Sequence, residues 1–282
     1  MLHEFAYFAP TSLDDLLSFL AEHGEDSKVF SGGTDLFVAI RAGLFKPAQV
    51  VDLKKVPELR ELSFDESEGL SIGACVTVNE LVDDPTVQSR YPILHTAGDE
   101  LATFQLRNRA TVVGNLVTAS PCGDMGSPML CLNARVELRS SRGTRSMPLQ
   151  EFITGVKKTQ IAADEIVTRV LVPTDQIDAR GGYKKLKRIK GHDLGVVSVA
   201  LVKARGAARI AISSAAPTPV LLPDFPLDTP IADIQAKAQE SISPIDDVRC
   251  TKEYRAFMVD VYIRRLMEEV AHPESRAEGS PV

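Results

Sequence analysis

Two short glycine-bearing turns, far apart in the chain, constrain the fold most strongly. The first covers residues 29–36, with Gly32 and Gly33 at its centre, and the second runs from Thr111 to Asn115. Each lies between an apolar strand end and a helix start, so its backbone N–H groups can face an anion beside a positive helix end. Neither turn matches a complete phosphate-loop motif. The residues alone therefore predict two anion-binding turns, with ordinary tight turns as the open alternative.

The composition describes an ordinary globular chain and argues against several kinds of partner. The 282 residues are 44% hydrophobic and 25% charged, and the net charge is −6. This balance argues against nucleic acid or an anionic membrane as the main partner. No segment has the length of a membrane span, and the N-terminus lacks the regions of a signal peptide, so we expect a cytoplasmic protein. The four cysteines have neither zinc nor iron–sulfur spacing, and no metal site is expected.

The order of the predicted elements indicates an α+β chain in three parts. Residues 1–58 show an αβαβ pattern that begins with a helix capped by Ser12. Residues 59–176 combine a hairpin at 62–72, helices at 78–82, 92–106 and 125–132, and strands at 134–139, 145–149 and 166–172. Residues 177–282 contain strands at 182–189, 195–203 and 207–214, helices at 231–240 and 251–270, and a disordered tail from 273.

Seven or so motifs, in order over residues 3–272, resemble a known family. They include Ser31-Gly32-Gly33-Thr34-Asp35-Leu36, Arg107-Asn108-Arg109-Ala110-Thr111-Val112-Val113-Gly114-Asn115, Ala119-Ser120-Pro121-Cys122-Gly123-Asp124 and Gly182-Tyr183-Lys184-Lys185-Leu186-Lys187-Arg188. The chain resembles the FAD-binding medium subunit of molybdenum hydroxylases of the carbon monoxide dehydrogenase and xanthine dehydrogenase type. The resemblance implies a vanillyl-alcohol-oxidase-like FAD-binding fold of two α/β subdomains, at 1–58 and 59–176. It also implies a C-terminal domain, 177–282, with a three-stranded sheet and helices.

The resemblance also implies which residues bind FAD. They are Val29, Phe30, Ser31, Gly32, Gly33, Thr34, Asp35 and Leu36 in the first turn, Thr111, Gly114 and Asn115 in the second, and Leu101, Asp124, Val167 and Lys184 elsewhere. Asp124 is expected on the sugar side of the flavin and Lys184 near its ring carbonyls, where a cation stabilises the reduced ring. From the residues alone, Thr34 with Asp35, and Asp124, could instead cap helices. Lys184 could instead belong to a solvated or subunit-docking basic strand face.

One position departs from the family pattern. The second turn of the family usually reads Thr-Ile-Gly-Gly-Asn, and Val113 stands here in place of the first glycine. Valine is costly at a positive φ and harmless at a negative φ. We expect a negative φ at Val113, so that only its backbone N–H group takes part in binding the cofactor.

The resemblance implies an oxidoreductase subunit through which electrons leave a larger complex. Molybdopterin and [2Fe–2S] clusters are expected on partner chains, because this sequence has no pattern for either centre, and no catalytic residue is expected here. The implied partners are a molybdopterin-binding large subunit and a [2Fe–2S] small subunit, in a dimer of heterotrimers. Two alternatives stay open: a flavin-free docking scaffold and a stand-alone flavin oxidase. The oxidase would need a large substrate domain, and the C-terminal region of about 100 residues is small for that.

Overall fold

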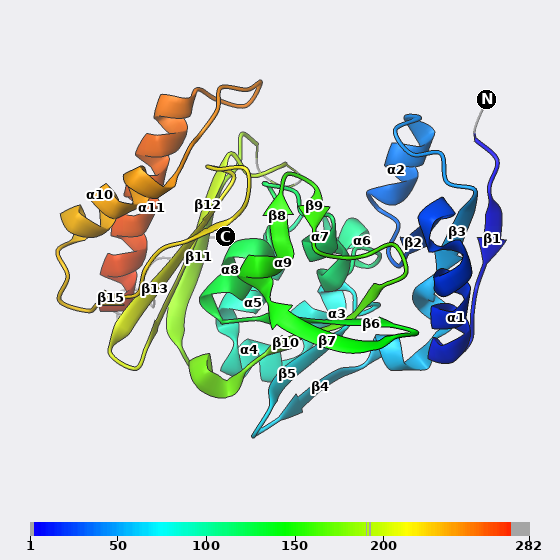
Figure 1. Ribbon diagram of the computed structural model, residues 1–282. Coiled ribbons are helices and arrows are strands. Elements are labelled where there is room, and N and C mark those ends of the chain that lie inside the picture. Colours follow the sequence, from blue (N-terminus) through cyan, green and yellow to red (C-terminus); the bar gives the residue numbers. More distant parts are fainter. Residues whose placement is uncertain (1–2, 190, 192, 272–282) are drawn as a thin grey trace. The chain divides into compact units, whose positions relative to one another are not determined.

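The computed structural model describes residues 3–189, 191 and 193–271, which fall into two compact units (Figure 1). Unit 1 is assembled from residues 1–81, 103–119 and 134–174, and unit 2 from 82–102, 120–133 and 175–282. Each unit therefore contains three separate stretches of chain. The tail predicted from residue 273 lies outside the described residues, and the division into domains at 58/59 and 176/177 stays a prediction.

Unit 1 begins with a small parallel sheet. Its strands β1 (Ala6–Phe8), β3 (Gln49–Asp52) and β2 (Ser27–Phe30) lie in the order β1-β3-β2, and the chain also forms α1 (Leu13–His23) and α2 (Leu36–Arg41). Ser12 caps α1 as predicted, because its Oγ accepts the Asp15 N–H at 3.1 Å. The leucine stripe of α1 is buried, which explains why this short segment stays helical.

The second sheet of unit 1 is antiparallel and has the order β4-β5-β10-β6-β7. Its strands are β4 (Leu62–Asp65), β5 (Gly69–Gly73), β10 (Ile166–Val172), β6 (Arg135–Ser140) and β7 (Gly143–Pro148). A small hairpin joins β8 (Ile153–Gly155) to β9 (Lys158–Thr159), and the short helices are α6 (Phe104–Arg107), α7 (Val112–Val117) and α9 (Leu149–Phe152). Helix α3 (Val78–Asp83) begins in unit 1 and ends in unit 2.

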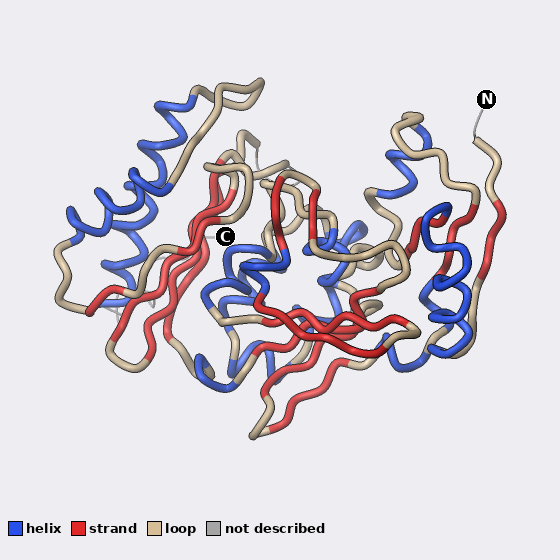
Figure 2. Tube along the Cα trace, viewed as in Figure 1, coloured by secondary structure: helices blue, strands red, loops and turns tan. Residues whose placement is uncertain are grey.

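Unit 2 is built on a sheet of three long antiparallel strands, β11 (Arg180–Leu186), β12 (Val197–Ala204) and β13 (Ala207–Ser213). The short strands β14 (Val220–Leu221) and β15 (Phe225–Pro226) both pair with β13. The helices of this unit are α4 (Pro85–Arg90), α5 (Pro92–Asp99), α8 (Gly126–Cys131), α10 (Ile231–Ser241) and α11 (Lys252–Ala271). Figures 1 and 2 show α10 and α11 on one side of this sheet and α5 and α8 on the other.

Many sequence-based expectations for these elements are confirmed, with corrections. The predicted αβαβ start is preceded by the strand β1, and the short elements α4, α9, β8 and β9 were not predicted. The three long C-terminal strands are present, and two further two-residue strands extend their sheet. The prediction of one helix over 92–106 is wrong. Ala102 has φ 47°, and Thr103 caps the separate helix α6 by accepting the Leu106 N–H at 3.2 Å. Within the described part of the chain, no helix is both long and apolar enough to span a membrane.

Candidate functional site

The first turn joins β2 to α2 in unit 1 and leaves a run of backbone donors free. Gly33 has φ +72°, a left-handed conformation that glycine adopts without strain, and its carbonyl accepts the Phe37 N–H at 3.2 Å. Among the described residues, none accepts a hydrogen bond from the backbone N–H groups of residues 31–36. Consecutive free N–H groups at the start of a helix form an anion-binding nest.

The two turns meet at Gly32. A Cβ atom built on Gly32 would lie 2.1 Å from the carbonyl oxygen of Arg109 and 3.1 Å from the Cα of Ala110. The backbone of the first turn therefore packs directly against the residues that lead into the second turn. Only glycine permits this approach. This packing brings the two predicted anion-binding turns together within unit 1.

The second turn is the capped start of helix α7. Thr111, which is 4% exposed, caps this helix, and its Oγ1 accepts the Gly114 N–H at 3.1 Å. A Cβ at Gly114 would lie 2.6 Å from that same oxygen, so glycine permits the cap. Val113 is buried in the first turn of α7 and is not among the residues with positive φ, as expected. The departure from the family pattern therefore causes no backbone strain.

The structure decides one local interpretation of the first turn and shows where two further predicted site residues lie. The interpretation of Thr34 as a helix cap is wrong, because Asp35 occupies the N-cap position of α2. The Asp35 side chain makes no capping hydrogen bond either. Val167, the apolar residue predicted beside the cofactor, lies in β10 and is 4% exposed, and a register irregularity between β10 and β6 follows it. Asn115 lies within α7.

The remaining predicted site residues belong to unit 2. Leu101 is buried just after α5. Lys184 forms an ion pair with Glu269 of α11, with Nζ and Oε1 2.5 Å apart. Asp124 does not cap α8, whose N-cap is Met125 without a capping side chain. Instead, its carboxylate accepts hydrogen bonds from side chains of β11.

Asp124 is held by a residue pair that the sequence analysis did not single out. The Tyr183 hydroxyl donates to Asp124 Oδ1 at 2.9 Å, and Lys185 Nζ lies 2.9 Å from both carboxylate oxygens. Lys185 Nζ also donates to the carbonyl of Glu100 at 3.1 Å, and its side chain is 1% exposed. Burial raises the pKa of Asp124, and the charge of Lys185 opposes that rise. Burial also raises the pKa of Tyr183 well above its ordinary value.

The alternation of a β-strand explains why Lys185 rather than Lys184 reaches Asp124. Side chains of successive strand residues point to opposite faces, so Tyr183 and Lys185 share one face of β11 and Lys184 has the other. In the structure Tyr183 is buried, and Lys185, two residues further along the strand, faces the same layer. The run of lysines in the sequence hid this difference.

A second contact holds the loop that carries Asp124. Arg249 Nη1 donates to Cys122 Sγ at 2.7 Å and to the Gly195 carbonyl at 2.9 Å. The guanidinium of Arg249 is itself paired with Asp247, which also binds Arg255. Hydrogen bonds from Arg249 keep the pKa of Asp247 far below its usual range, although burial acts in the opposite direction. Arg249, itself held by Asp247, thus fixes the turn before α8.

Comparison with known proteins agrees with this geometry. Residues 3–175 match the family described as the FAD binding domain in molybdopterin dehydrogenase. The nicotine 6-hydroxylase medium subunit of Paenarthrobacter nicotinovorans is 32% identical over 276 residues, which are 93% of this chain and 96% of the relative. The carbon monoxide dehydrogenase medium chain of Hydrogenophaga pseudoflava is 28% identical, with 93% and 96% coverage.

Solved structures give the same result for the fold. A chain of the Cu,Mo-CO dehydrogenase in its cyanide-inactivated form superposes with a TM-score of 0.89 at 28% identity, covering 96% of this chain and 99% of that chain. A chain of quinoline 2-oxidoreductase from Pseudomonas putida 86 superposes with a TM-score of 0.88 at 28% identity, covering 97% and 99%. The protein is a flavin-binding oxidoreductase subunit of α+β fold. It belongs to the family of FAD-binding domains of molybdopterin dehydrogenases.

Proposed function

We propose that this chain is the FAD-binding electron-transfer subunit of a multi-subunit molybdenum hydroxylase. The observation that carries the proposal is the run of free backbone N–H groups over residues 31–36, packed through Gly32 against the approach to the second turn. A pyrophosphate carries several anionic oxygens, and a nest of consecutive N–H donors suits such a group. The residues present therefore fit FAD.

The chain's own residues would bind and orient this cofactor. The N–H groups of the first turn would hold the pyrophosphate, and Thr111 would keep the second turn in its helical conformation by capping α7. Asp124 and Lys184 would lie toward the sugar and the ring, as the resemblance implies, together with Leu101 and Val167 as apolar neighbours. When bound, FAD accepts electrons one at a time and can deliver two together.

The partners belong to the same proposal. Two similar proteins are called a medium chain and a medium subunit, and this chain aligns with nearly their whole length. We therefore infer a molybdopterin-binding large subunit and a [2Fe–2S] small subunit beside it, arranged as a dimer of heterotrimers in the cytoplasm. In this arrangement electrons would reach the flavin from the iron–sulfur clusters and leave to an external acceptor.

The identity of the flavin gives the first test. We expect acid extraction of the purified protein, followed by chromatography, to release FAD rather than FMN, because two adjoining turns suit a pyrophosphate better than a single phosphate. Reconstitution of the flavin-depleted chain with each flavin in turn supplies the control. Recovery of FMN alone, or no flavin after reconstitution, would contradict the proposal and favour the flavin-free scaffold.

The direction of electron flow gives the second test. We expect the tagged chain to copurify with two further subunits, one containing molybdenum and one containing iron, by elemental analysis. In a stopped-flow instrument, the chemically reduced iron–sulfur subunit should bleach the flavin absorbance rapidly. The isolated chain mixed with carbon monoxide, xanthine or nicotine should not change. Rapid bleaching by one of these compounds without partners would refute the electron-exit role and support a stand-alone oxidase.

A further inference from the structure

The carboxyl edge of the small parallel sheet in unit 1 carries a polar cluster beside the first turn. Phe30 at the end of β2 is in register with Asp52 at the end of β3, and β1 pairs with β3 in the same direction. The ends of parallel strands meet at one edge of a sheet, where ligands of open α/β sheets commonly bind. The first turn leaves from this edge directly after Phe30.

Asp52 is the buried carboxylate to which the other polar groups of this cluster bind. It is 4% exposed, and its Oδ2 accepts the Tyr7 hydroxyl at 2.6 Å. Lys54 Nζ lies 2.8 Å from each carboxylate oxygen, and the Lys54 backbone N–H donates to Oδ1 at 2.9 Å. Burial opposes ionisation of Asp52, but hydrogen bonds from Lys54 and Tyr7 outweigh it and lower its pKa. The ammonium group of Lys54 is therefore held in one place by a buried carboxylate.

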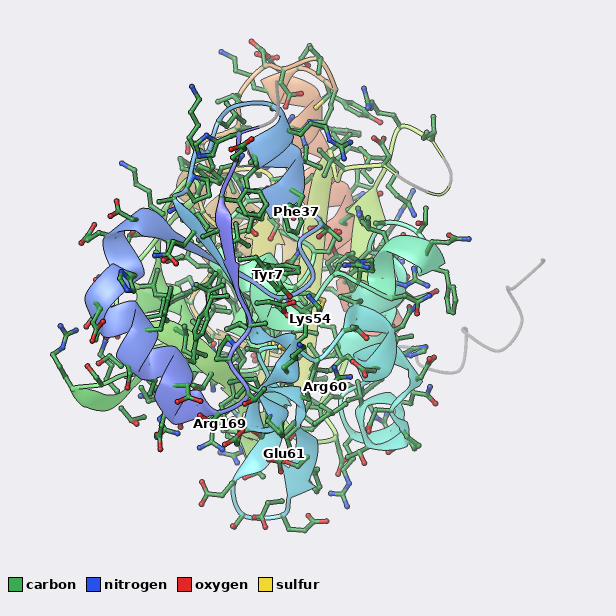
Figure 3. All side chains as sticks on the ribbon, turned by 90° about the vertical axis from the view of Figure 1, so that its right-hand side faces the viewer. Tyr7, Phe37, Lys54, Arg60, Glu61 and Arg169 are labelled. Atoms are coloured by element: carbon green, nitrogen blue, oxygen red, sulfur yellow. The ribbon has the colours of Figure 1, made fainter. Side chains whose placement is uncertain are left out.

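From this place the ammonium group covers an aromatic ring of the first turn. Lys54 Nζ lies 3.5 Å from the centroid of the Phe30 ring, well inside the range of a cation–π contact. The Phe30 ring in turn meets Phe37 edge to face, with 4.9 Å between centroids. Figure 3 shows the labelled Tyr7, Lys54 and Phe37 on the same side of the protein.

The rings of Phe30 and Phe37 pack against Gly33, the residue at which the first turn changes direction. A Cβ atom at Gly33 would lie 2.7 Å from Phe37 Cδ2 and 3.0 Å from Phe30 Cδ2, so the left-handed residue of the turn rests against both rings. A continuous series of contacts thus leads from Asp52 through Lys54 and Phe30 to Gly33. A shift of the Phe30 ring would change the direction of the free N–H groups that follow Phe30.

We propose that Lys54 is a positioning residue of the anion-binding first turn, and that it acts on this turn through the ring of Phe30. The proposal rests on the proposed binding of FAD. Lys54 does not contact the pyrophosphate in this account; its ammonium group fixes the ring that supports the turn. The neighbouring Lys55 is exposed and serves as a matched control, since it has the same side chain without these contacts.

The test compares FAD affinity in single and double variants of the full chain. We expect Lys54→Met to weaken FAD binding about tenfold, measured by flavin fluorescence on titrating the flavin-depleted protein. Lys54→Arg should restore most of the affinity, because a guanidinium can also pair with Asp52 and stack on Phe30. Lys55→Met should bind FAD as the unchanged protein does. In a Phe30→Leu background, Lys54→Met should have little further effect.

The outcomes separate this inference from the proposed function. If the unchanged protein binds no FAD, the proposed function fails, and the role of Lys54 fails with it. If the unchanged protein binds FAD and Lys54→Met binds it equally well, only the role of Lys54 is overturned. A Lys54→Met variant that loses thermal stability but keeps its FAD affinity would show that the cluster serves the fold alone. Equal losses for Lys54→Met with and without Phe30→Leu would overturn the route through Phe30.

Discussion

Gly32→Ala is expected to lower the affinity for FAD about a hundredfold or more. The added methyl carbon would lie 2.1 Å from the Arg109 carbonyl oxygen and 2.9 Å from its carbon. Both neighbours are backbone atoms, which cannot rotate away as a flexible side chain would. The turn must therefore move as a whole, and its free N–H groups lose their alignment. Titration of the flavin-depleted variant with FAD measures the effect, and circular dichroism checks that the fold persists.

Gly155→Ala is the matched control for this substitution. Gly155 also belongs to unit 1, and a Cβ there would meet only Lys158 Cβ and Cδ at 3.8 Å, an ordinary contact distance. We expect this variant to bind FAD unchanged. If Gly32→Ala keeps full flavin occupancy together with a native spectrum, the first turn is only structural and the FAD-binding proposal loses its main support.

Lys185→Met is expected to destabilise the protein by about 3–5 kcal/mol. The substitution leaves the buried carboxylate of Asp124 without its cation, while the Tyr183 hydroxyl alone still donates to it. A buried charge without a partner is far more costly than a missing surface ion pair. Urea denaturation at neutral pH measures the change in the free energy of unfolding. Lys184→Met removes the partly exposed pair with Glu269 and should cost no more than about 1 kcal/mol.

The pH dependence of the free energy of unfolding shows whether the unpaired charge of Asp124 causes the destabilisation of Lys185→Met. The pKa of Asp124 is raised in the folded protein by burial, and removal of Lys185 should raise it further. For a carboxyl group with a raised folded pKa, the destabilising effect is present above that pKa and disappears as the pH falls through it. The deficit of Lys185→Met should therefore shrink toward acid pH, and Asp124→Asn combined with Lys185→Met should recover part of the stability. A deficit independent of pH would instead indicate lost packing.

Local signals in the sequence predicted much of the fold. Ser12 followed by the leucine stripe of α1 is such a signal, because a cap and a helical period act within one segment. Two long strands of unit 2, β12 and β13, were likewise visible as apolar runs, whereas β11 is basic. For the site, the two glycine turns indicated anion binding, and the ordered motifs indicated FAD. The individual site residues remain predictions.

What the sequence could not reveal depends on contacts between distant segments. The break at Ala102 follows from the capping of a new helix by Thr103, while the apolar period continues across the break and predicted a single helix. The pairing of Lys185 with Asp124 joins residues far apart in the chain, and a run of similar lysines does not show which one points inward. The support of Gly33 by Phe30 and Phe37 likewise requires the folded turn.

The alternation of the chain between the two units limits how the protein can be divided. A fragment ending at residue 175, where the family match ends, would retain α5 and α8 but lack the strands β11, β12 and β13 that they pack against. Buried residues of these helices, such as Leu94 and Met129, would then face solvent. Neither half can therefore be expressed, or exchanged by recombination, as a self-sufficient module. A fragment that starts at residue 176 would in turn lack α5 and α8, so each part is a folding requirement of the other.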